Sequence, residues 1–172
     1  SSELSVLTGK GLGRGDTKPN ISDQIEIMKS RRLIGKVVDN LKLNIRYFTD
    51  GRVKKQELFD ESPIQVSVLT KDPSPVSFEV FIKSKSEIEI IQGERIIKST
   101  FGSPIKLGSV EFTVLPKNKS VGRTIQVSIM SVNSGISTYK GRLTIAPLND
   151  GSVLSVSMVD NLPGRAKKVI DE

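Results

Sequence analysis

The sequence feature that most constrains the fold is a series of short segments in which apolar and polar residues alternate. Clear examples lie at residues 64–68, 78–82, 110–114 and 125–129, each with apolar residues at every second position. Turn-forming residues separate such segments at a spacing of about ten residues. Alternation with period two is typical of a strand that is buried on one face. We therefore predict antiparallel sheet, in a sandwich or barrel-like arrangement, for the middle of the chain.

One long helix is predicted on the N-terminal side of this middle part, at residues 22–41. Asn20 or Ser22 can cap its start, and no proline interrupts it. Its apolar residues follow helical steps and form one stripe, made of Ile27, Ile34, Val38 and Leu41. Its other side carries the basic residues Lys29, Arg31, Arg32 and Lys36. These four are either a solvated face or a basic surface for an acidic partner or anionic headgroups.

The C-terminal part of the chain predicts two strands and the start of a second helix. The strands lie at residues 142–147 and 154–158, and Pro163 suits the first turn of the helix. This helix has no stop signal before Glu172, so we expect the sequence to be part of a longer protein. The predicted fold class is therefore α+β, with a mixed or antiparallel sheet, a packed helix at about 22–41 and the truncated start of a long C-terminal helix.

Composition excludes several kinds of catalytic site. The 172 residues include no Cys, His or Trp, which removes Cys- and His-based nucleophiles, the Ser-His-Asp triad and Cys/His zinc sites. Glu87 and Glu89 are two residues apart on a predicted strand, which is typical of an exposed strand face rather than of an acid–base pair. The glycine-rich segment 8–20 lacks the Gly-Lys-Ser/Thr of a phosphate-binding loop. We therefore predict no catalytic residue, no cofactor and no metal site.

The charge of the chain is mildly basic. Its net charge of +7 comes from 26 basic and 19 acidic residues. Nucleic-acid-binding proteins usually gather such charge on one element beside aromatic residues, and the most basic stretches here contain no aromatic residue. We therefore expect no nucleic-acid partner. No apolar run reaches the roughly 18 residues that a membrane-spanning helix needs.

Three stretches carry a resemblance to a known family. The first, residues 23–43, contains Glu26-Ile-Met-Lys-Ser-Arg31 and then Val37-Val-Asp-Asn-Leu-Lys-Leu43. The second is the turn Phe101-Gly-Ser-Pro104, which leads into a strand. The third, residues 143–166, ends in Asp160-Asn-Leu-Pro163-Gly-Arg-Ala166. Together they resemble the periplasmic region of Wzz-type polysaccharide co-polymerases, the chain-length determinants of O-antigen, capsule and exopolysaccharide, which include the transmembrane part of bacterial tyrosine autokinases.

The resemblance implies a single periplasmic domain over residues 1–172. Residues 1–59 and 133–172 would form an α/β base, and residues 60–132 a β-rich insertion. Such a domain is a non-catalytic scaffold that forms a homo-oligomer in the full-length protein. With the polysaccharide polymerase or export machinery, it controls polymer chain length or export.

The resemblance also implies a place at the periplasmic face of the bacterial inner membrane. The parent protein would be anchored by flanking helices that this chain does not contain, and it could carry a cytoplasmic tyrosine kinase domain. Because the predicted helix lies near the membrane in this family, Lys29, Arg31, Arg32 and Lys36 become candidates for contacts with a neighbouring copy or with lipid headgroups. The resemblance implies no functional motif that can be assigned to particular residues of this sequence.

Two other functions stay open on the sequence. One is a free-standing carbohydrate- or protein-binding β-rich module, against which the missing helix stop argues. The other is a small hydrolase, against which the lack of His, Cys and a convergent carboxylate pair argues.

Overall fold

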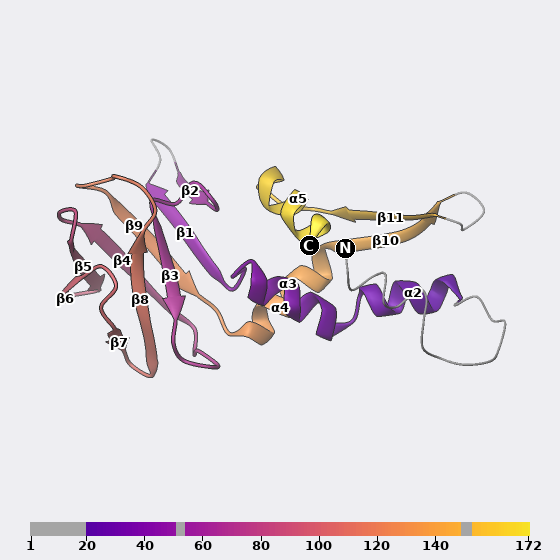
Figure 1. Cartoon of the computed structure of the whole chain (residues 1–172), viewed down its shortest axis with the longest axis horizontal. Helices are drawn as coiled ribbons and strands as arrows, with labels where there is room; N and C mark the ends of the chain where they lie inside the picture. Colours follow the sequence, from indigo (N-terminus) through magenta and orange to yellow (C-terminus); the bar gives the residue numbers. More distant parts are fainter. Residues whose placement is uncertain (1–19, 51–53, 149–152) are drawn as a thin grey trace.

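The computed structural model describes residues 20–50, 54–148 and 153–172, and these form two halves joined by two short connections (Figure 1). The described residues from 45 to 129 form the first half, which we call the sandwich. The remaining described residues form the second, which contains helices and one hairpin and which we call the helix–hairpin half. The predicted strand at residues 3–7 and the glycine-rich segment lie outside the described residues.

Nine strands build the sandwich, in two antiparallel sheets. The larger sheet contains β1 (Ile45–Asp50), β2 (Lys55–Leu58), β4 (Val76–Ile82), β5 (Glu87–Gln92), β6 (Arg95–Thr100) and β9 (Thr124–Ile129), in the order β2-β1-β9-β4-β5-β6. The smaller sheet contains β3 (Ile64–Val68), β7 (Ile105–Leu107) and β8 (Val110–Pro116), in the order β3-β8-β7. The predicted alternation at residues 64–68, 78–82, 110–114 and 125–129 is confirmed as strands.

The two sheets enclose one apolar core. On β4, Phe78, Val80 and Ile82 are buried at every second position, as expected for strands that cover a core on one face. The rings of Phe78 and Phe112 stack across the core with centroids 4.6 Å apart. The Val66 amide on β3 donates a hydrogen bond of 2.8 Å to the hydroxyl of Tyr47 on β1, which ties one sheet to the other.

Four helices and a hairpin form the helix–hairpin half. They are α2 (Ile21–Met28), α3 (Arg31–Asn40), α4 (Val132–Arg142), β10 (Leu143–Leu148), β11 (Val153–Met158) and α5 (Pro163–Asp171). A second core of Ile34, Val38, Leu43, Ile136, Tyr139 and Val169 joins α3, α4 and α5. Two glycines let α3 and α4 approach closely: a Cβ on Gly135 would lie 3.1 Å from Val38, and a Cβ on Gly35 would lie 3.2 Å from Ile136.

The predicted α+β class is wrong, because the chain has a β-rich fold. Eleven strands in three antiparallel sheets make up 42% of the described residues, against 26% in helices. Every strand pair in the described ranges is antiparallel, so the mixed sheet is also wrong. The smaller sheet covers the inner face of the larger one, and the outer face is largely polar. The larger sheet therefore has no apolar face against which a helix could pack.

The predicted single helix at 22–41 is also corrected, because it is two helices. Lys29 ends α2, and Ser30 has an extended backbone with φ −64° and ψ 142°. The Ser30 hydroxyl accepts a hydrogen bond of 3.2 Å from the Leu33 amide, which caps a new helix at that point. The helix predicted to start at Pro163 is present as α5. The domain division stays a prediction; β1 and β2, which it assigned to the base, pair in the same sheet as β9.

Candidate functional site

A network of buried and half-buried charges lies where the two halves meet. Its centre is Arg165 on α5, which is only 3% exposed. The Arg165 guanidinium donates hydrogen bonds of 2.8 and 2.7 Å to the carboxylate of Asp160 and also pairs with Glu57 on β2. Two further arginines complete the network: Arg46 on β1 donates two hydrogen bonds of 2.8 and 2.7 Å to Glu57, and Arg142 pairs with Asp160 at 3.2 Å. The five charged side chains therefore join strands of the sandwich to α4 and α5.

Burial and pairing act in opposite directions on the three central groups. Burial alone would raise the pKa of Glu57 and of Asp160 and would lower that of Arg165, because it disfavours the charged form. Hydrogen bonds between Arg165 and the two carboxylates outweigh this effect, with help from Arg46 at Glu57 and from the Leu162 amide at Asp160. The pKa of both carboxyls is therefore lowered and the pKa of Arg165 is raised, so all three groups carry charge at neutral pH.

Other contacts fix α5 beside the sandwich. Phe59, which directly follows β2, packs against the second core, and Lys168 of α5 pairs with Asp60 and lies 5.7 Å from the centre of the Phe59 ring. At the end of the helix, the side-chain amide of Asn40 donates a hydrogen bond of 2.8 Å to Glu172. The helix is thus held both by the sandwich and by α3.

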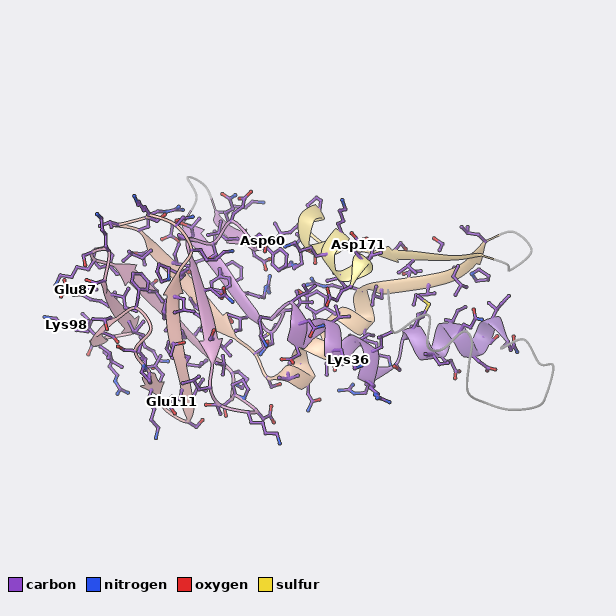
Figure 2. All side chains as sticks on the ribbon, in the orientation of Figure 1. Lys36, Asp60, Glu87, Lys98, Glu111 and Asp171 are labelled. Atoms are coloured by element: carbon purple, nitrogen blue, oxygen red, sulfur yellow. The ribbon has the colours of Figure 1, made fainter. Side chains whose placement is uncertain are left out.

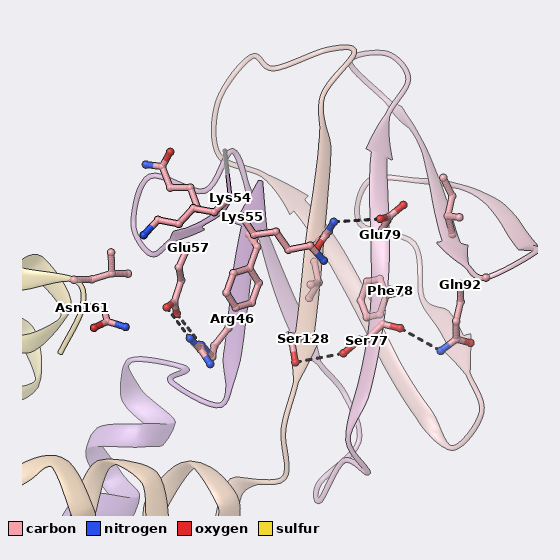
Figure 3. Close-up of a pocket in the computed structure, with 17 residues that line it drawn as sticks. Arg46, Lys54, Lys55, Glu57, Ser77, Phe78, Glu79, Gln92, Ser128 and Asn161 are labelled. Carbon is pink, nitrogen blue, oxygen red and sulfur yellow. Dashed lines mark hydrogen bonds and ion pairs between the residues drawn. The ribbon is translucent and has the colours of Figure 1, made fainter. Parts of the chain in front are cut away.

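A wide groove lies beside this network, on the outer face of the larger sheet (Figure 3). It has a volume of about 1400 Å³. Two rows of paired residues cross its floor from β1 through β9 to β4: Phe48, Gln126 and Glu79 in one row, Arg46, Ser128 and Ser77 in the other. Asn161 and Leu162, which precede α5, line it from the other half of the molecule. We call this feature the sheet-face groove.

Most of the polar groups on the floor of the groove are weakly bonded to one another. The side-chain amide of Gln126 lies 3.4 Å from Glu79 and 3.5 Å from Asp50, and the hydroxyls of Ser77 and Ser128 are 3.4 Å apart. These distances are longer than the usual hydrogen-bond range of about 2.7–3.2 Å. Arg46 differs, because its guanidinium makes two short bonds to Glu57. The floor therefore offers donors and acceptors that a ligand could take over.

The four basic residues singled out by the sequence lie in the helix–hairpin half and none of them lines the groove. Lys29 is half-buried and ends α2, while Arg31, Arg32 and Lys36 are exposed on α3, and Figure 2 shows Lys36 on that helix. The Arg31 guanidinium donates a hydrogen bond of 3.3 Å to Asn133 on α4. Part of this basic surface therefore also stabilises the packing of α3 against α4.

The residues of the network and of the groove were not predicted from the sequence. Arg46 and Glu57 lie on neighbouring strands, β1 and β2, but Arg165 is 108 residues from Glu57 in the sequence, and only the fold brings it to them. One signal was available at Asp160, because it begins the segment Asp160–Ala166 that ends the third family-like stretch. Its carboxylate accepts a hydrogen bond of 2.8 Å from the Leu162 amide, and its side chain is fully buried. Glu87 and Glu89 lie together on β5, and Glu89 pairs with Lys83 at 3.6 Å.

Neither a metal site, a membrane-spanning helix nor a related protein gives a further clue to the function. Among the described residues, no group of three or more acidic side chains is placed to hold a metal ion. In the same ranges, no helix combines the length and the apolar character needed to cross a membrane. No protein-family model and no curated protein matches the chain.

Proposed function

We propose that the chain is the periplasmic scaffold domain of a Wzz-type polysaccharide co-polymerase. In this role it catalyses no reaction. It holds copies of the parent protein together at the periplasmic face of the inner membrane and so controls the length or the export of a capsular polysaccharide, an exopolysaccharide or O-antigen. Its partners are other copies of itself and the polysaccharide polymerase or export machinery.

One observation supports this proposal more than any other. The first and third family-like stretches are separated by about one hundred residues, yet their elements lie in the same half of the molecule (Figure 1). Helix α2 lies against β10, and Asn40 at the end of α3 is bonded to Glu172. The residues between these stretches form the sandwich and α4. This arrangement suits a base from which a β-rich part projects.

The basic residues at the end of α2 and on α3 can take part in such a scaffold. Lys29, Arg31, Arg32 and Lys36 lie in the half of the molecule that we propose as the base. Cations there can pair with acidic groups of a neighbouring copy or with anionic lipid headgroups. The proposal therefore assigns these four residues to assembly at the membrane.

The experiment is a charge reversal in the organism that encodes the chain. Replacing Lys29, Arg31, Arg32 and Lys36 by glutamate in the full-length protein is expected to shift the length distribution of the surface polysaccharide on a gel. A matched control reverses four exposed lysines of the sandwich: Lys85, Lys98, Lys106 and Lys119. The control is expected to leave the distribution unchanged.

Deletion of the gene decides whether the proposal stands at all. If the surface polysaccharide keeps its amount and its length distribution without the gene, the scaffold function is wrong. The second candidate, a free-standing carbohydrate- or protein-binding module, would then take its place, because the sheet-face groove favours a binding role in either case.

A further inference from the structure

We infer that the sheet-face groove binds an extended segment of a neutral polysaccharide. The site itself is argued from the groove alone. That the bound glycan is the polymer handled by the parent protein rests on the proposed function. The inference assigns a ligand class to a surface that the scaffold role does not use.

The side chains of the groove match the hydrogen-bonding needs of sugar hydroxyls. Each hydroxyl both donates and accepts a hydrogen bond, so a saccharide needs donors and acceptors mixed along its length. The amides of Gln126, Gln92 and Asn161 offer both, the hydroxyls of Ser77 and Ser128 offer both, and the carboxylate of Glu79 accepts. These groups come from β9, β4, the end of β5 and the segment before α5, so they extend across the groove.

A ligand would lose little free energy by breaking the existing hydrogen bonds of the floor, because these bonds are long and weak. The bonds from Gln126 to Glu79 and to Asp50 are 3.4 and 3.5 Å long, and Gln92 donates to the Ser77 carbonyl at 3.3 Å. A hydroxyl at an ordinary distance of about 2.8 Å would replace a weak contact by a stronger one. The network around Arg165, by contrast, contains four charged hydrogen bonds of 2.7–2.8 Å, which a sugar hydroxyl would not improve.

Phe48 supplies the apolar surface that a sugar ring also needs. A pyranose has a face of C–H groups, which packs on an aromatic ring. Phe48 stands half-buried in the floor, in the same row as Gln126 and Glu79. The Arg46 guanidinium lies 5.0 Å from the centre of the Phe48 ring, which fixes the ring in place. Polar groups therefore surround a single aromatic platform.

The same residues disfavour other ligand classes. The lining carries three cations, Arg46, Lys54 and Lys55, and two carboxylates, Glu57 and Glu79. Glu57 neutralises Arg46, so the groove has a net charge of only +1, which is far from the clustered positive charge that a nucleic acid needs. A peptide helix requires a row of apolar pockets, but the apolar side chains Phe78 and Val127 at the floor are buried in the core. The groove, at about 1400 Å³, exceeds the roughly 300–1000 Å³ of small-molecule pockets. Its size suits several linked sugars.

The test is a titration of the ¹⁵N-labelled chain with three neutral hexasaccharides: maltohexaose, laminarihexaose and mannohexaose. Side-chain amide signals report directly on the groove, because Gln126, Gln92 and Asn161 each carry one. With at least one of the three sugars, these signals are expected to shift in a saturable way, with a Kd of about 1 mM. A deoxythymidine hexanucleotide serves as the charged probe and is expected to leave them unchanged.

Two variants and one control locate the binding. Phe48→Ala is expected to weaken binding about five- to tenfold, and Asn161→Ala, in an exposed segment, tests the opposite wall without touching the core. Phe81→Ala is the matched control, since Phe81 is half-buried on β4 like Phe48 on β1 but does not line the groove. Thermal melting of each variant checks that it folds. If Phe48→Ala unfolds, Asn161→Ala decides the outcome, with an expected weakening of about twofold or more.

Each result has a clear meaning. The inference is overturned if no hexasaccharide shifts the three amides at about 20 mM, if only the hexanucleotide shifts them, or if the folded groove variants bind as well as the control. If the groove binds no hexasaccharide but gene deletion changes the polysaccharide, the scaffold function stands and only the binding site is wrong. If the groove binds a hexasaccharide but gene deletion leaves the surface polysaccharide unchanged, the scaffold function is wrong and the chain is a saccharide-binding module.

Discussion

At the scale of single residues, the most informative feature is the pair of carboxylates around Arg165. Glu57 and Asp160 keep a lowered pKa in the folded chain because three arginines surround them. In the unfolded chain these carboxyls return to ordinary values of about 4.3 and 3.9. Their contribution to stability is therefore complete above those values and is lost as the pH falls through the lower values of the folded state.

The pH dependence of one variant tests this reasoning. Glu57→Gln is expected to lower the free energy of unfolding at pH 7, because it removes the charged partner of Arg46 and Arg165. The difference between the wild type and this variant should stay constant from about pH 8 to pH 5 and shrink below about pH 4. Urea unfolding at a series of pH values measures it.

Glu94→Gln is the control for this experiment. Glu94 is exposed in the turn between β5 and β6, and the described residues show no ion pair to it. This substitution should change the free energy of unfolding little at any pH. A wild type–Glu57→Gln difference that persists unchanged down to about pH 2 would contradict the role assigned to the Glu57 carboxylate.

At the scale of elements, the contact between α3 and α4 depends on small residues. A Cβ on Gly135 would meet Val38 at 3.1 Å and Asn44 at 3.4 Å. Val38 is fully buried and β-branched, so it cannot rotate away. Gly135→Ala is therefore expected to lower the free energy of unfolding by about 1 kcal/mol despite the better helix propensity of alanine.

The same helix contains a matched control. Nothing lies within 4 Å of a Cβ on Gly141, so Gly141→Ala gains helix propensity without a clash. It should raise the free energy of unfolding by up to about 1 kcal/mol. Chemical denaturation of both variants measures the two effects, and equal signs for the two substitutions would show that the packing of α3 on α4 is not limiting.

Some of the helices and strands could be predicted from the sequence, and others could not. The alternation of Phe78, Val80 and Ile82 identified β4 correctly, because a half-buried strand must alternate. Helix α4 was not expected: it contains two glycines and several β-branched or polar residues, and its formation depends on packing against α3. Strand β6 was missed because Ile96, 57% exposed, breaks the alternation. Local pattern predicts strands that cover a core, and tertiary contacts decide the rest.

The candidate site was less predictable for the same reason. Arg46 and Glu57 lie on polar positions of strands, where charge is ordinary and no local pattern marks it. Their partner Arg165 comes from a helix and lies 108 residues after Glu57 in the sequence. The floor of the groove is likewise a matter of register, since Phe48, Gln126 and Glu79 meet only when β1, β9 and β4 pair.

At the scale of the whole molecule, Arg165 is expected to keep the two halves unfolding together. Arg165→Met removes the central cation and leaves the fully buried Asp160 carboxylate with less compensation, which should cost about 3 kcal/mol. The helix–hairpin half, whose core includes Val169 of α5, should then unfold before the sandwich. Lys168→Met, which removes an exposed ion pair on the same helix, should cost less than about 1 kcal/mol.

The chain offers a natural probe for each half. It has two tyrosines and no tryptophan: Tyr47 packs against the core of the sandwich and Tyr139 lies in the second core. Tyrosine fluorescence of Tyr139→Phe reports the sandwich, and that of Tyr47→Phe reports the helix–hairpin half. The two midpoints should coincide in the parent chain and separate with Arg165→Met. Coincident midpoints in both backgrounds would show that the network does not couple the halves.

The position of α5 has a mechanical consequence. The Arg165 guanidinium of α5 pairs with Glu57 on β2. One turn further along the helix, Lys168 pairs with Asp60 and lies over the ring of Phe59. A torque on α5 therefore acts on the strands and not only on the neighbouring helices. We therefore expect a tilt of α5 to move the sandwich, and with it the sheet-face groove.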